Sequence, residues 1–137
     1  MTENPLAKNM KLTPNLHATL VQAPAGYLET LRPLPGGVQL SDKLEGRFDW
    51  VQIFVKNKSE LKTLAPLAIA AQKAESLLWI TFPKGTSNIQ TDLTRDKGWE
   101  TFQGADLKWI NLVSVNETWS AFSLRPYKPG EEQQSFR

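Results

Sequence analysis

The sequence predicts a three-layer α/β domain in which helices cover both faces of a mostly parallel sheet. Short apolar runs rich in β-branched residues alternate with segments of helical spacing, the order expected when crossover helices join parallel strands. The last two such runs follow each other through a short turn, which predicts a C-terminal antiparallel hairpin. With 137 residues, 40% of them hydrophobic, the chain is long enough for one domain with its own core.

The first half of the chain predicts a strand, a short helix and two further strands. Prolines end both the first strand and the helix, because proline cannot donate to a ladder or continue a helix. The third strand, FDWVQIFV, is nearly continuous in apolar character and broken only by Asp49 and Gln52, as expected of a central strand covered on both faces. The predicted ranges are 17–23 for the first strand, 26–31 for the helix, and 38–40 and 48–55 for the next two strands.

The second half predicts a helix, a strand, a second helix and the hairpin. Pro66 lies inside the first of these helices and predicts a kink or a restart there. Asn116 and Glu117 are suitable residues for a two-residue turn between the last two strands. The predicted ranges are 59–74 for the first helix, 76–82 for the strand, a start at 92 or 94 for the second helix, and 107–115 and 118–125 for the hairpin.

Both ends of the chain are polar and interrupted by proline, so residues 1–15 and 126–137 are predicted to be tails around a single domain over 16–125. No stretch of about 18 uncharged apolar residues occurs, and the N-terminus lacks the apolar segment of a signal peptide. The absence of cysteine agrees with a reducing compartment and removes disulfides, thiolate zinc sites and cysteine nucleophiles. We therefore expect a cytoplasmic protein without membrane contact.

The composition gives little support for nucleic-acid binding or for a catalytic constellation. The net charge of +2 comes from mixed acidic and basic residues rather than from a basic block, and the five tryptophans fall within apolar patterns typical of a core. His17 is the only histidine and begins a strand, so neither a histidine metal cluster nor a Ser-His-Asp relay can be assembled. No pair of carboxylates is spaced for acid and base roles, and no metal site is predicted.

A ligand site is predicted where the parallel strands end, because open α/β sheets bind ligands beyond the carboxyl ends of their strands. The loop PKGTSNIQTDLTRD combines hydroxyls and cations with a helix N-terminus, which together suit a phosphate or carboxylate. Its candidate binding residues are Lys84, Thr86, Ser87, Thr94 and Arg95. The alternative is structural, because Thr91, Asp92 and Thr94 are common helix caps. Arg95 can likewise pair with Asp92 or Asp96 to hold the loop.

Three further positions beyond predicted strand ends are candidates for the same site. Gly26 and Tyr27 follow the first strand, and Asp42 follows the second. Tyr27 could stack on an adenine, but its helical spacing with Leu31 favours a buried position. Asp49 is interpreted as a strand-entry residue whose carboxylate bonds backbone N–H groups.

Five segments carry a resemblance to known proteins, namely APAGY at 23–27, GRFD at 46–49, LWITFPK at 78–84, TDLTRD at 91–96 and TWSA at 118–121. The middle of the chain resembles class I S-adenosylmethionine methyltransferases. Residues 11–126 resemble more closely a bacterial domain-of-unknown-function family of small methyltransferase-like proteins. The resemblance implies a Rossmann-like three-layer fold and a cytoplasmic bacterial protein, but it implies no activity.

Two departures from that resemblance bear on function. Working methyltransferases of this class carry a GxGxG loop after the first strand, whereas this chain reads QAPAG there and keeps only Gly26. They also have one strand more before the third predicted strand, so Asp42 can match either the ribose-binding acid or a later acid on the adenine side. Pro24 and the methyl group of Ala25 narrow the space that glycines leave open.

These departures predict a non-catalytic or degenerate binding module without a cofactor, with S-adenosylmethionine as the less favoured option. The alternative function is an enzyme or sensor for a small anionic or nucleotide-like ligand at the strand ends. A small anionic ligand is one expected partner, and the exposed edge of the hairpin makes a homodimer another. Nucleic acid and membrane are not expected partners.

Overall fold

The computed structural model describes residues 5–32, 34, 36–84, 91, 93 and 107–126, which contain a six-stranded sheet of order β2-β1-β3-β4-β6-β5. The first four strands along the chain pair in parallel, whereas β6 is antiparallel to both β4 and β5. This arrangement confirms the predicted fold class. The strands are β1 (His17–Val21), β2 (Gln39–Ser41), β3 (Phe48–Phe54), β4 (Gln72–Pro83), β5 (Leu107–Ser114) and β6 (Trp119–Pro126).

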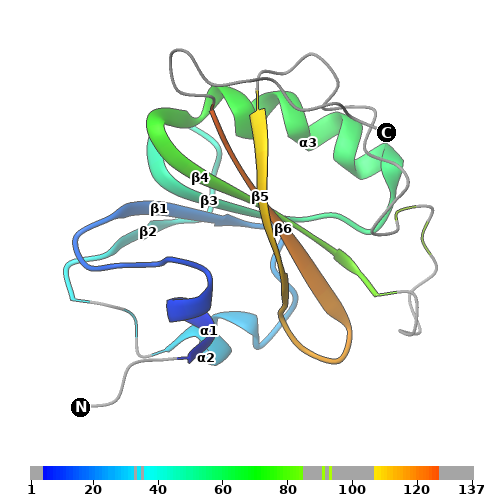
Figure 1. The fold of residues 1–137 in the computed structure, drawn as a ribbon, viewed down its shortest axis with the longest axis horizontal. Coiled ribbons are helices and arrows are strands. Elements are labelled where there is room, and N and C mark those ends of the chain that lie inside the picture. The colour runs from blue at the N-terminus through cyan, green and yellow to red at the C-terminus, as the bar shows by residue number, and fades with distance from the viewer. Residues whose placement is uncertain are drawn as a thin grey trace.

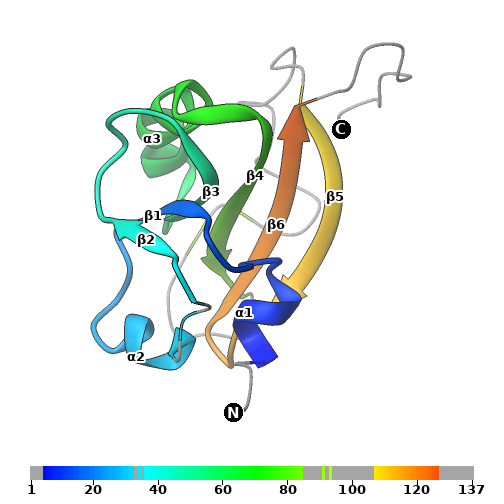
Figure 2. The same cartoon turned by 90° about the vertical axis from the view of Figure 1, so that its left-hand side faces the viewer.

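Helices lie on both faces of the sheet. The described helices are α1 (Pro5–Asn9), α2 (Tyr27–Leu31) and α3 (Lys58–Ala70). In Figure 1, α3 lies on one side of the sheet while α1 and α2 lie together on the other, and the turned view in Figure 2 agrees. The sheet is therefore the middle of three layers, and side chains alternating along each strand feed a core on either side of it.

The central strand β3 divides its side chains between these two cores. Val51 and Ile53 are fully buried in the core beneath α3, whereas Trp50 and Phe54 are buried in the core beneath α1 and α2. Such double burial explains why the strand is almost continuously apolar in sequence. The core position predicted for the tryptophans is confirmed for Trp50, Trp79 and Trp119, while Trp109 is only partly buried and Trp99 lies outside the described residues.

Of the kink or restart predicted at Pro66, the restart is wrong, because one helix runs from Lys58 to Ala70 with Pro66 inside it. The buried residues of α3 are Leu61, Ala65 and Ala68, whereas Pro66 and Lys62 are both exposed. Proline at 66 cannot donate to the carbonyl of Lys62, but that carbonyl lies on the exposed side, where water can bond it. The helix also ends earlier than predicted, since β4 already begins at Gln72.

Part of the expected N-terminal tail belongs to the core, so that prediction is wrong over residues 5–12. Ala7, Met10 and Leu12 are at most 2% exposed. The backbone carbonyl of Met10 accepts hydrogen bonds from the indole Nε1 of Trp50 at 2.8 Å and of Trp79 at 2.9 Å. Strands β3 and β4 thus both bind the N-terminal segment through the Met10 carbonyl. The order of polar and apolar residues around Met10 does not predict this contact.

The β5–β6 connection is longer than the predicted two-residue turn and spans residues 115–118. The Asn116 side chain organises it, because Oδ1 accepts from the backbone N–H of Thr118 at 2.8 Å and of Trp119 at 2.9 Å. An asparagine that bonds backbone two or three residues ahead favours such a turn. The helix predicted from residue 92 or 94 and the C-terminal tail after Pro126 lie outside the described residues.

Candidate functional site at the carboxyl ends of the parallel strands

The carboxyl ends of β1, β2, β3 and β4 lie along one edge of the sheet because these strands are parallel. The chain leaves β1 to form β2 on one side, and β3 then pairs with β1 on its other side. The strand order therefore reverses between β1 and β3, and a ligand crevice in an open α/β sheet is expected at such a reversal. The residues that follow β1 and β3 accordingly decide what this edge can bind.

The loop after β1 is shaped by two residues with left-handed backbone conformation. Gln22 has φ 60° and Gly26 has φ 84°, and Gly26 is the N-cap of α2 without a side-chain cap bond. A Cβ at Gly26 would meet no atom within 4 Å, so the backbone conformation and not crowding favours glycine there. The loop is closed by the Tyr27 N–H, which donates to the Pro24 carbonyl at 3.1 Å.

The side chain of Gln22 joins the two strands at the reversal point. Its Nε2 donates to the backbone carbonyl of Phe54, the last residue of β3, at 2.9 Å. This contact spans from the residue after β1 to the end of β3, across the place where a bound group would enter. The sequence analysis missed Gln22 as a site residue, although its place as the first residue of QAPAG was a usable signal.

The N-terminus of α3 follows β3 and is capped by the side chain of Asn57. Asn57 Oδ1 accepts from the Glu60 N–H at 2.9 Å, and a Glu60 carboxylate oxygen accepts from the Lys56 N–H at 2.7 Å. This exchange resembles a capping box, in which cap and third residue satisfy each other's backbone. The α3 terminus is consequently a poor anion site, since the Glu60 N–H is already bonded and the Glu60 carboxylate lies beside the remaining donors.

The end of β2 presents Asp42 to solvent and fixes the backbone on either side of it. Thr19 Oγ1 of β1 donates to the Lys43 carbonyl at 2.6 Å, and the Lys43 N–H donates to Ser41 Oγ at 3.2 Å. Asp42 is exposed between these two anchored residues. Asp42 therefore lies beyond the end of β2, and its role in binding a ligand stays a prediction.

Lys84 lies just after β4 and is tied to the hairpin. Its Nζ donates to Ser114 Oγ of β5 at 2.6 Å, and its backbone N–H donates to the Thr118 carbonyl at 2.8 Å. The other proposed members of its loop, Thr86, Ser87, Thr94 and Arg95, lie outside the described residues. Of the suggested caps, Thr91 Oγ1 accepts from the Leu93 N–H at 3.0 Å, a local turn bond.

Tyr27 lies in the core and not at the edge, with 3% of its surface exposed. Its hydroxyl donates to Gln52 Oε1 at 3.0 Å, and Gln52 Nε2 in turn donates to Thr81 Oγ1 at 2.8 Å. The three side chains form a satisfied polar chain across β3 and β4 beneath the β1 loop. Sequence reasoning recognised Gln52 as an interruption of an apolar strand but did not connect it with Tyr27.

Burial raises the pKa of Tyr27 from 10.0 to about 12, which predicts a stability loss in strong base. The neutral hydroxyl stabilises the fold fully below pH 10, and this contribution declines as the pH rises toward 12, by about 1.4 kcal/mol per pH unit. Urea unfolding of the natural chain and of Tyr27→Phe, compared between about pH 9 and about pH 12, measures it. An unchanging difference between the two chains would contradict the prediction.

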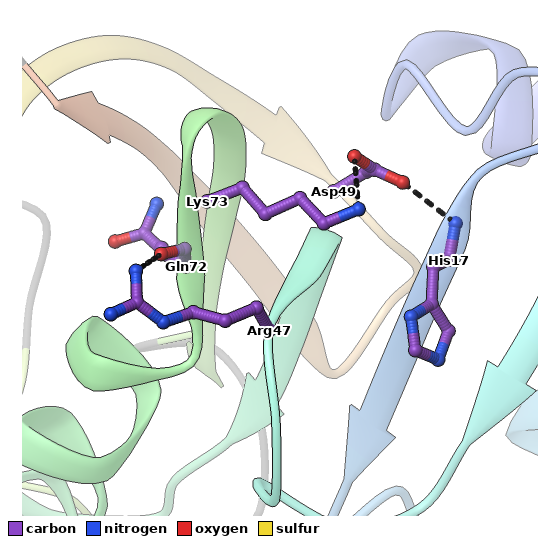
Figure 3. A network of polar contacts seen from close by, with 5 residues as sticks. All are labelled: His17, Arg47, Asp49, Gln72 and Lys73. Carbon is purple, nitrogen blue, oxygen red and sulfur yellow. Dashed lines mark hydrogen bonds and ion pairs between the residues drawn. The ribbon is translucent and has the colours of Figure 1, made fainter.

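A second polar network lies at the opposite, amino-terminal edge of the strands. Figure 3 shows Asp49 between Lys73 and the backbone of His17, with Arg47 beside Gln72. Asp49 Oδ2 accepts from the His17 N–H at 2.9 Å, and Oδ1 lies 3.2 Å from Lys73 Nζ. The His17 backbone bond, followed by Lys73, lowers the pKa of Asp49. The strand-entry role predicted for Asp49 is confirmed, and this network connects β1, β3 and β4 structurally.

The described part of the chain contains neither a metal site of clustered ligands nor a membrane-spanning helix. No group of three or more histidine, cysteine, aspartate or glutamate side chains there could hold a metal ion. Among the same residues, no helix is long and apolar enough to cross a membrane.

Solved structures resemble this fold at low sequence identity. The ribosomal protein L11 methylase of Lactobacillus delbrueckii subsp. bulgaricus has TM-score 0.57 and 11% identity, over 89% of this chain and 76% of its own. The tRNA methyltransferase TrmK of B. subtilis has TM-score 0.51 and 10% identity, over 93% of this chain and 67% of its own. This chain has a methyltransferase-like fold. No family model and no curated protein matches it.

The methyltransferase-like fold raises the question of S-adenosylmethionine. LepI, solved in complex with that molecule, has TM-score 0.50 and 12% identity, over 89% of this chain but only 39% of LepI. In this chain, exposed Asp42 after β2 and the positive φ of Gly26 agree with a nucleotide-binding edge. The Gln22 bond to Phe54 does not fit the group, and neither do Gln22 and Pro24 at two positions where the GxGxG loop has glycines, because such a loop leaves its backbone open to the cofactor.

Proposed function

We propose that this chain is a methyltransferase-like binding module that no longer transfers methyl groups from S-adenosylmethionine. The observation that carries the proposal is the Gln22 side chain, bonded to the Phe54 carbonyl across the strand-order reversal. The domain retains the sheet and the exposed loops of the methyltransferase-like fold. In this proposal, the Gln22–Phe54 bond crosses the place where a cofactor would enter. Such a scaffold acts through contacts made by its edge loops and its surface rather than through chemistry in the crevice.

The side-chain cap at the N-terminus of α3 and the bond between Lys84 and Ser114 support the same proposal. Both features direct polar groups at the carboxyl edge toward the protein itself. Near α3, a small anion would be repelled by the Glu60 carboxylate and would compete with it for the Lys56 N–H. At Lys84, the anion would have to replace the Ser114 hydroxyl as the partner of Nζ. The alternative function, an enzyme or sensor for a small anionic or nucleotide-like ligand, therefore has less support among the described residues.

A thermal-shift and calorimetric titration with S-adenosylmethionine and its demethylated product tests the proposal. A ligand at a hundredfold its dissociation constant stabilises a domain by about 2.7 kcal/mol, which is roughly 5–15 °C in melting temperature for a chain of this size. We expect neither compound to produce a shift or heat with the natural chain. Stabilisation that Asp42→Asn abolishes would overturn the proposal.

A matched variant shows whether the Gln22–Phe54 bond blocks the cofactor or whether the site simply has low affinity for it. Gln22→Gly removes the bond to Phe54 and relaxes the left-handed backbone at residue 22, so it should fold at least as well. A shift with Gln22→Gly alone would identify the bridge as the barrier. Nucleotides and sugar phosphates belong in the same screen, where a shift of the natural chain that Lys84→Ala removes would establish the alternative function.

A further inference from the structure

We draw no further inference here: the strongest candidate, the outer edge of β5 with the exposed side chains of Ile110 and Leu112, carries nothing, because no contact within the described part of the chain shows what covers it.

Discussion

Deleting residues 1–12 is expected to abolish cooperative folding, although much of this segment is polar in sequence. The deletion removes the buried side chains of Met10 and Leu12, each worth about 1.5–3 kcal/mol. It also leaves the indole N–H groups of Trp50 and Trp79 buried without their shared acceptor, at about 1–3 kcal/mol each. The sum, roughly 5–12 kcal/mol, is comparable with the whole stability of a typical domain.

Circular dichroism and urea unfolding measure this effect, with Met10→Leu as the matched control. The control keeps the backbone carbonyl and nearly the same volume, so it should lose less than about 1.5 kcal/mol. A second check replaces Trp50 and Trp79 by phenylalanine, singly and together. Each single variant leaves one donor on the Met10 carbonyl, so the double variant should lose more stability than the two single losses combined. A deleted chain that melts cooperatively near the natural temperature would contradict this account.

Gln52→Leu is expected to destabilise the protein by about 2–4 kcal/mol, one of the largest effects of a single substitution in this chain. The change is close in size, but it removes the partner of the Tyr27 hydroxyl and of Thr81 Oγ1 inside a core where Gln52 and Thr81 are fully buried. Equilibrium unfolding in urea measures the loss. The main cause is the loss of both hydrogen bonds and not the lost volume, because the Tyr27 hydroxyl keeps only a weak contact with Met10 Sδ at 3.7 Å.

The triple variant Tyr27→Phe, Gln52→Leu and Thr81→Val supplies the control. It replaces every member of the polar chain by an apolar side chain of similar shape, which can be nearly neutral when no partner is left behind. The triple variant should therefore regain most of the stability that Gln52→Leu loses. If the triple variant is as unstable as the single one, packing and not hydrogen bonding explains the effect.

The fold could be predicted because its elements carry local signals. The alternation of apolar strands with helical spacing, and the double burial of FDWVQIFV, follow from side-chain periodicity alone. The exceptions are contacts between distant parts of the chain. Met10 is followed by lysine and lies in a polar stretch, so only the two indoles facing it in three dimensions show that it is buried. Pro66 likewise depends on which side of α3 meets the sheet.

The candidate site was predicted less completely, because its residues act through rotamers and partners that sequence does not state. Gly26 and Asp42 do lie beyond strand ends, as the alternation of elements requires. Tyr27 also follows β1, directly after Gly26, but its side chain points inward to Gln52. An aromatic side chain on the first turn of α2 contacts the core and not the loop. Gln22 shows the opposite case, in which an ordinary polar residue with a left-handed backbone bonds the end of a second strand.

The bond between Met10 and Trp79 joins residues that are 69 positions apart. During translation this segment leaves the ribosome before β3 and β4, so its acceptor gains both donors only after Trp79 has been made. The burial of Ala7, Met10 and Leu12 therefore depends on strands that are made after them. Closing so long a loop also slows the last step of assembly, so refolding in the test tube should be limited by the arrival of this segment.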